Sequence, residues 1–203
     1  SVIATAGSAI SPWGPPALTG TATNFSILPL LPAGLSIDSA TGVISGTPGF
    51  PNPSTVHTVT ASNPAGSTTT TVTLTVRSIF QSWAANYGLD PATNGASGAD
   101  PDGDSLSNAV EYAFGTSPVS GAGEVVESSA SGGLFTIQWL QRTDGAATYT
   151  VQETASLSSS WTSSASVVQA GSGSTPPTGY EWKKITVPAT DRKFYRVNAV
   201  LSP

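Results

Sequence analysis

Short runs of alternating hydrophobic and polar residues fill the first part of the chain. They lie at 24–28, 35–38, 42–45, 56–61 and 67–76, and segments such as Pro-Ala-Gly and Asn-Pro-Ala-Gly separate them. Alternation with a period of two is typical of strands that bury one face, and Gly- and Pro-containing segments of this kind form turns. Residues 1–77 are therefore predicted to fold as an antiparallel β-sandwich.

Between residues 78 and 120 the hydrophobic period becomes helical. One helix is expected within 78–89, ending near Gly88, and a second over about 106–114, ending at Gly115 and Pro118. Their apolar faces contain Ile79, Phe80, Trp83, Ala84 and Tyr87 in the first helix, and Leu106, Val110, Ala113 and Phe114 in the second. Helices this short are not stable alone in water, so each needs the other, a metal ion or a neighbouring sheet.

Residues 121–203 return to strand-like runs. The runs lie at 134–141, 148–154, 166–169, 182–187 and 194–201, and turn signals rich in Gly, Pro and Asp separate them. A second β-sandwich is predicted here. The chain as a whole is therefore expected to be mainly β.

The segment 100–111, DPDGDSLSNAVE, has the spacing of a calcium loop of the EF-hand type. Such a loop takes oxygen ligands from positions 1, 3, 5, 7, 9 and 12, with a backbone carbonyl at position 7 and a bidentate glutamate at position 12. The residues at these positions are Asp100, Asp102, Asp104, Leu106, Asn108 and Glu111. Position 6, which is usually glycine, is Ser105, and Gly103 is expected to share the bend.

The charge distribution around this acidic loop (residues 100–111) favours a cation. Residues 78–141 contain no Lys or Arg, whereas they contain seven acids: Asp90, Asp100, Asp102, Asp104, Glu111, Glu124 and Glu127. Carboxylates packed together repel one another, and a bound divalent cation removes this repulsion. We therefore predict one Ca²⁺ ion. The alternative is a solvated acidic turn in which Asp104 or Ser105 caps the second helix.

Composition narrows the classes of partner. Charged residues make up 9% of the chain, the formal net charge is −5, and seven basic residues are too few to neutralise a nucleic-acid backbone. The most apolar stretch, 27–35, is interrupted by Pro29 and Pro32, so we expect no membrane span. The absence of Cys and Met suits a protein outside the cell, although it is also compatible with the cytosol.

Three parts of the chain carry resemblances to known proteins. LPAGLSIDSATGVISGTP (31–48) with VHTVTASNPAGSTTTTVTLTV (56–76) resembles the immunoglobulin-like modules repeated in bacterial secreted and surface proteins. DGDSLSNAVEYAFGTSP (102–118) resembles the calcium segments of dockerins, thrombospondin type 3 repeats and bacterial surface proteins. YTVQETASLSSSW (149–161) and FYRV (194–197) resemble a C-terminal β-sandwich of secreted proteins from environmental bacteria.

These resemblances imply a fold, a location and a division of the chain. They imply two Ig-like antiparallel β-sandwiches (1–77 and 121–203) joined by a short helix–calcium loop–helix segment (78–120) in a secreted or cell-surface protein. Dockerins carry two such loops and bind a cohesin, whereas this chain has one loop, so cohesin binding does not carry over. Ig-like modules of this type usually begin several residues before the equivalent of Ser1, so the first strand is expected to be incomplete.

Catalytic chemistry has little support in the sequence. His57 is the only histidine, it lies in a strand-like run, and there is no cysteine. A zinc site, a thiol nucleophile and a Ser-His pair are therefore not expected. We interpret His57 as a surface or half-buried strand residue, and we expect no enzymatic activity.

The predicted function is that of a calcium-stabilised, non-enzymatic, extracellular structural protein. Its segment 1–10 is alternating and uncharged, and we hypothesise that it adds to the sheet of another copy, which would build a homopolymeric filament or surface layer. The proposed assembly strand is Ser1, Val2, Ile3, Ala4, Thr5 and Ala6. The simpler possibility is that this segment completes its own domain in a monomeric spacer.

The alternative function is a carbohydrate-binding or adhesive spacer module of a secreted bacterial protein. Its partner would be a surface glycan stacked on exposed aromatic rings. The chain offers five tryptophans: Trp13, Trp83, Trp139, Trp161 and Trp182. The spacing of Trp83 on the helical stripe and of Trp139 in a strand indicates that both belong to the core.

Overall fold

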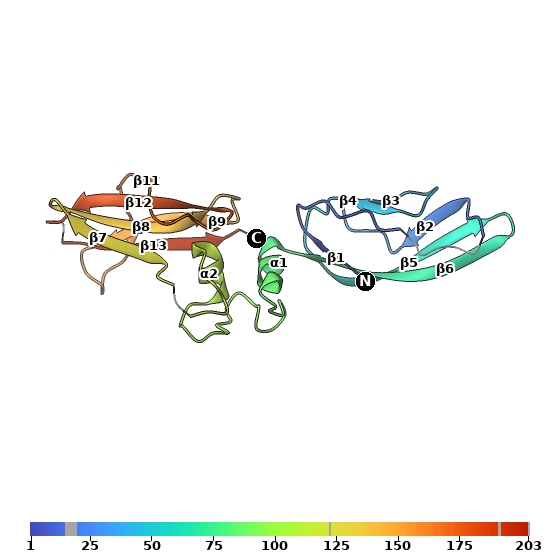
Figure 1. The fold of residues 1–203 in the computed structure, drawn as a ribbon, viewed down its shortest axis with the longest axis horizontal. Helices are drawn as coiled ribbons and strands as arrows, with labels where there is room; N and C mark the ends of the chain where they lie inside the picture. Colours follow the sequence, from blue (N-terminus) through green and yellow to red (C-terminus); the bar gives the residue numbers. More distant parts are fainter. Residues whose placement is uncertain (15–19, 122, 191, 203) are drawn as a thin grey trace. The chain divides into compact units, whose positions relative to one another are not determined.

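The computed structural model describes residues 1–14, 20–121, 123–190 and 192–202. These residues are mainly β, with two short helices among them (Figure 1). The chain divides into two compact units, residues 1–83 (unit 1) and 84–203 (unit 2). Of the helices in the described ranges, none is both long and apolar enough to cross a membrane.

Unit 1 contains a four-stranded and a two-stranded sheet. The first has the strand order β1-β6-β5-β2, and the second pairs β3 with β4. The bounds are β1 (Val2–Thr5), β2 (Asn24–Leu28), β3 (Leu35–Ile37), β4 (Ile44–Gly46), β5 (Asn52–Asn63) and β6 (Gly66–Arg77). Each strand-like run of this part contains a strand. β5 and β6 are longer than predicted, because they pair both as far as their connecting turn and, across a register shift between Asn52 and Thr55, at the opposite end.

Alternation along these strands builds the core of unit 1. Phe25 and Ile27 are buried while their neighbours in β2 are exposed, and they pack with Ile44, Val59 and Val72. His57 is buried in β5, and its Nδ1 lies 2.8 Å from the carbonyl oxygen of Pro29. The histidine is therefore more deeply buried than predicted, and a backbone contact holds its ring.

Two glycines permit close backbone contact between the ends of β3 and β4. Gly34 has φ +93°, and a Cβ atom there would lie 2.0 Å from the carbonyl oxygen of Thr47. Gly46 has φ +122°, and its Cβ would lie 2.2 Å from the carbonyl oxygen of Gly34. The glycine spacing of residues 31–48 therefore has a steric cause, since any side chain at either position would push the two backbones apart.

The first strand corrects one prediction. β1 pairs with β6 in parallel, with Val2 opposite Leu74 and Thr5 opposite Arg77, so unit 1 is not purely antiparallel. β1 and β6 are the first and last strands of the unit, and no hairpin turn imposes an antiparallel pair on strands so far apart in sequence. The N-terminal segment thus completes the sheet of its own chain, which was the simpler of the two possibilities.

Helix α1 (Ile79–Asn86) lies in the predicted segment. Ser78 and Gln81 form a reciprocal capping box: the Gln81 amide donates to Ser78 Oγ (3.0 Å), and the Ser78 amide donates to Gln81 Oε1 (2.9 Å). Gly88, with φ +78°, follows the helix end as predicted.

Unit 2 contains two antiparallel sheets and helix α2. The four-stranded sheet has the order β11-β12-β8-β7 and the three-stranded sheet the order β10-β9-β13. The bounds are α2 (Asn108–Phe114), β7 (Val126–Ser131), β8 (Leu134–Arg142), β9 (Ala147–Thr154), β10 (Thr162–Ser163), β11 (Gln169–Ala170), β12 (Tyr180–Pro188) and β13 (Phe194–Leu201). The run at 166–169 is a strand only from Gln169 onward.

Both sheets of unit 2 bury side chains in one core, and α2 belongs to it. Trp139 of β8, Ile185 of β12 and Val151 of β9 pack there with Ala113 and Phe114 of α2. The neighbouring sheets thus give α2 the support that its length required. Residues 78–120 are not a separate compact unit, because α2 shares the core of the strands that follow it.

Candidate metal centre

The acidic loop curls so that three carboxylates converge. Asp100, Asp102 and Asp104 each place one carboxylate oxygen within 4.8 Å of the others. The curl depends on two residues in the left-handed region, Gly103 and Ser105, both with φ +77°. Ser105 is the only non-glycine residue with positive φ among those described, and it occupies the position where such loops usually have glycine.

Backbone amides orient these aspartates. Asp100 accepts hydrogen bonds from the amides of Gly103 (2.9 Å) and Ser105 (3.0 Å), and Asp104 accepts one from the amide of Leu106 (2.8 Å). The carboxylates are therefore held by the loop itself. Each aspartate keeps further lone pairs that can face a cation, since a carboxylate can accept about four hydrogen bonds.

Glu111, the predicted bidentate ligand, is the most deeply buried carboxylate of the predicted ligand set. It is 0% exposed, and neither of its carboxylate oxygens has a hydrogen-bond partner among the described residues. Burial, followed by the neighbouring charges of Asp102, Asp104 and Asp100, raises the pKa of this carboxyl to about 7. A buried ionised acid without a partner is costly, and either a proton or a bound cation removes that cost.

Asn108 joins the acidic loop to the segment before it. Its side chain is fully buried, and Nδ2 donates to the carbonyl oxygens of Asn94 and Ala96, at 2.8 Å each. Its backbone amide donates to Ala99 (2.8 Å). Because the amide nitrogen is committed to these carbonyls, Oδ1 remains as an acceptor, and it has no hydrogen-bond partner among the described residues.

The structure contradicts the helix-capping alternative in its stated form. α2 begins at Asn108, and its N-cap residue is Ser107, whose side chain makes no capping hydrogen bond. Asp104 and Ser105 therefore do not cap the helix. The three ion pairs found among the described residues involve Asp144, Glu153 and Glu181, which lie outside the acidic loop.

The donor set fits a hard divalent cation. Three converging aspartates and one buried glutamate supply carboxylate oxygens, which Ca²⁺ prefers as ligands. Among the described residues, no group donates a hydrogen bond to the oxygens of Glu111 or to the buried Oδ2 of Asp102. These are the groups that such an ion would satisfy.

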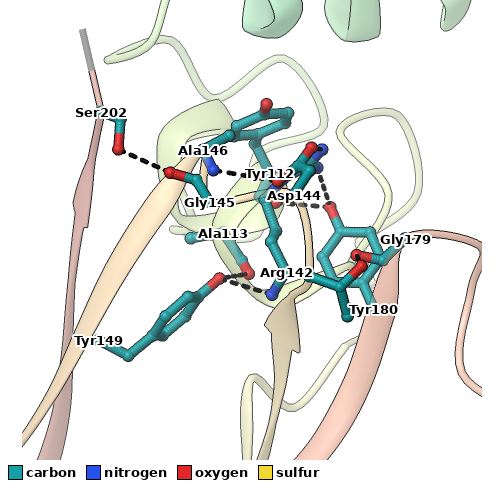
Figure 2. A network of polar contacts seen from close by, with 11 residues as sticks. Tyr112, Ala113, Arg142, Asp144, Gly145, Ala146, Tyr149, Gly179, Tyr180 and Ser202 are labelled. Carbon is teal, nitrogen blue, oxygen red and sulfur yellow. Dashed lines mark hydrogen bonds and ion pairs between the residues drawn. The ribbon is translucent and has the colours of Figure 1, made fainter.

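Sequence analysis did not predict a group of residues that contacts the C-terminal end of α2, shown in Figure 2. The Tyr149 hydroxyl donates to the carbonyl oxygen of Ala113, and the Tyr180 hydroxyl donates to that of Tyr112 (2.6 Å). The guanidinium of Arg142 lies 3.8 Å from the centre of the Tyr112 ring and donates to the Tyr180 hydroxyl (2.8 Å). We call Tyr149, Tyr180 and Arg142 the helix clasp.

The five tryptophans do not form an open platform. Each is at least partly buried, and Trp139 belongs to the core as expected. The guanidinium carbon of Arg196 lies over the ring of Trp161, 4.4 Å from the ring centre. The indole nitrogen of Trp182 donates to the carbonyl oxygen of Ser174 (2.8 Å).

The comparison with known families concerns unit 1. Residues 1–77 match the model of the family described as "Putative Ig domain", and the match ends at the last residue of β6. The match supports an Ig-like module in this segment. Domains of this type are typically non-catalytic and are common in extracellular proteins. No curated protein matches the chain.

Proposed function

We propose that the chain is a calcium-stabilised structural module of an extracellular protein, of spacer or adhesive type. The Ig-like module supports the extracellular structural role. The observation that carries the calcium proposal is the buried carboxylate of Glu111, which has no hydrogen-bond partner among the described residues and lies near three converging aspartates.

The proposed ligands are those of the sequence spacing. Asp100, Asp102, Asp104 and Glu111 would supply carboxylate oxygens, Leu106 its backbone carbonyl and Asn108 its side-chain oxygen. The ion would neutralise the acidic loop and satisfy the buried oxygens. Because these groups are brought together only in the folded chain, the binding free energy would add to the free energy of unfolding.

A melting experiment tests the proposal. At a calcium concentration about 100 times Kd the gain is about 2.7 kcal/mol, which for a domain of this size is roughly 10 °C in Tm. Glu111→Gln is expected to lose most of that gain. Glu124→Gln, which removes the same charge from an exposed residue outside the loop, is the matched control and should keep it. A Tm that is the same in calcium and in chelator would refute the calcium site.

Filament assembly through residues 1–6 is a second proposal. β1 is a four-residue edge strand, and Ile3 is 58% exposed on it. Assembly would require β1 of one copy to take the place beside β6 of the next copy, as an open chain of exchanged strands. Electron microscopy of the protein in millimolar calcium would show regular polymers, and deletion of residues 1–10 would abolish them. Polymers that survive the deletion would exclude this mechanism.

Glycan binding remains the alternative proposal. It requires aromatic rings that can open to a sugar, and the partly buried Trp182 is a candidate because its ring lies on the glycine-rich segment 171–174. A glycan screen that follows tryptophan fluorescence would test it. Unchanged fluorescence with every glycan, together with dispersed particles in the microscope, would leave the spacer role.

A further inference from the structure

We infer that the acidic loop and the two sheets of unit 2 fold as one cooperative unit, so that the loop retains Ca²⁺ only while the sheets are folded. Calcium would then stabilise the strands as well as the loop. This inference rests on the proposed calcium site. It assigns α2 as the element that connects the acidic loop to the sheets.

Helix α2 carries one end of the proposed site but is not stable alone. It has seven residues, fewer than an isolated helix needs in water. Glu111 lies in its first turn, directly before Tyr112. Ala113 and Phe114 are buried in the core between the sheets. The rings of Phe114 and Tyr149 pack edge to face, with their centres 5.7 Å apart. Glu111 therefore has its position only when α2 is docked on the strands.

The helix clasp holds the C-terminal end of α2. The last carbonyls of a helix have no partner within it, and other groups must satisfy them. The carbonyl of Glu111 accepts from the amide of Gly115 (2.8 Å). The carbonyls of Tyr112 and Ala113 accept from Tyr180 and Tyr149. Two consecutive carbonyls are thus capped by tyrosines of the sheets rather than by the chain that follows.

The two tyrosines come from different sheets. Tyr149 lies in β9 of the three-stranded sheet, and Tyr180 lies in β12 of the four-stranded sheet. The end of α2 is therefore attached to both layers of unit 2. Separation of the layers would break at least one of these hydrogen bonds.

Arg142 of β8 links the members of the clasp, as Figure 2 shows. Its guanidinium donates to Tyr180 and forms an ion pair with Asp144, and its backbone amide donates to the Tyr149 hydroxyl (3.1 Å). The hydrogen bond from Arg142 holds the pKa of Asp144 below its usual range. A cation at the C-terminal end of a helix is also favourable for the helix dipole.

Amide hydrogen exchange of the full chain tests the inference. With calcium at 100 times Kd, the amides of β8, β9 and β12 should exchange about 100-fold more slowly than in chelator, because unfolding of the strands would release the ion. If the loop could hold calcium while the strands were unfolded, only the loop amides would slow down.

The outcomes separate the inference from the calcium proposal. Slowing of both loop and strand amides supports the inference. Slowing of the loop alone overturns it and leaves the calcium site intact. Exchange that is the same in calcium and in chelator everywhere overturns both. The strands of unit 1 serve as the internal reference and should not respond.

A pair of substitutions tests the clasp itself. Tyr149→Phe with Tyr180→Phe removes the two hydroxyls and keeps both rings. The loss of two hydrogen bonds should make the α2 amides exchange roughly ten- to a hundredfold faster in chelator. Tyr195→Phe, on a ring that packs against the same core from β13, is the matched control. Equal α2 exchange in the double variant and the control would overturn the role of the clasp.

Discussion

The buried carboxyl of Glu111 makes the stability of the calcium-free protein depend on pH in an unusual direction. Its pKa is about 7 in the folded chain, compared with an ordinary value of 4.5. Between these two values the folded state holds a proton that the unfolded state has released. Stability therefore falls as pH rises through this window, because the folded state binds more protons.

The size of the effect follows from the difference between the two pKa values. One pKa unit corresponds to about 1.4 kcal/mol, so a difference of this size is worth roughly 3 kcal/mol of unfolding free energy. Carboxyls whose folded pKa is depressed, such as Asp144 and Glu153, contribute stability that is lost only as pH falls through their low folded pKa. They do not offset the change above pH of about 5.

The assay is a set of melting curves in chelator and in calcium at pH 5 and pH 8. In chelator, Tm of unit 2 should be roughly 10 °C lower at pH 8 than at pH 5. Calcium at pH 8 should restore the loss, because the ionised form of Glu111 is the form that would bind the ion in the proposed site. Glu111→Gln should remove both the fall with pH and most of the gain with calcium, whereas Glu124→Gln should change neither.

One result would refute this reasoning. If the Tm of unit 2 in chelator stays level or rises between pH 5 and pH 8, Glu111 does not hold its proton in the folded chain. Its oxygens would then have a partner or access to water, and the argument for a cation at this residue would lose its main observation.

Three further predictions concern backbone and amide contacts. Gly34→Ala should cost about 3 kcal/mol or more and lower the melting transition of unit 1 alone, because its Cβ would meet the carbonyl of Thr47 at 2.0 Å. Ser105→Gly should stabilise unit 2 by about 0.5–1 kcal/mol in urea unfolding. Glycine adopts the left-handed backbone conformation without the steric cost that serine has there, and this gain is larger than the extra conformational entropy that glycine gives the unfolded chain. Asn108→Ala should destabilise unit 2 by about 2–3 kcal/mol in chelator, because it leaves two carbonyls unpaired. The loss should be larger in calcium, because the proposed ligand oxygen is also removed; a loss seen only in calcium would contradict the role of the two carbonyls.

The parts of the fold that the sequence predicted are those with local causes. The runs 24–28 and 194–201 are strands with the predicted bounds, because alternation and turn residues act over a few positions. The parallel pairing of β1 with β6 has no such signal, since it joins segments about seventy residues apart. Residues 166–168 do not form a strand, and Val167 is 73% exposed. The alternation there therefore does not reflect a buried face.

The candidate site divides in the same way. The spacing of the acidic loop predicted six ligands, and the carboxylates of three of them, Asp100, Asp102 and Asp104, lie together because a loop brings its own residues together. It gave no information about Tyr149 and Tyr180, which lie in ordinary strands and meet α2 only through tertiary packing. The two hydrogen bonds from Asn108 Nδ2 to the carbonyls of Asn94 and Ala96 could not be predicted either, since no sequence pattern pairs a side chain with those carbonyls.

The two parts of the chain differ in how they balance charge. Residues 1–77 contain one acid, Asp38, and one base, Arg77, for a net charge of 0. The remaining residues contain eleven acids and six bases, so they carry the whole net charge of −5. Seven of these acids lie in 78–141, where there is no base, and the proposed Ca²⁺ ion would compensate those of the acidic loop. Folding of unit 2 should accordingly depend on the cations of its surroundings, whereas the Ig-like module should fold equally well in chelator.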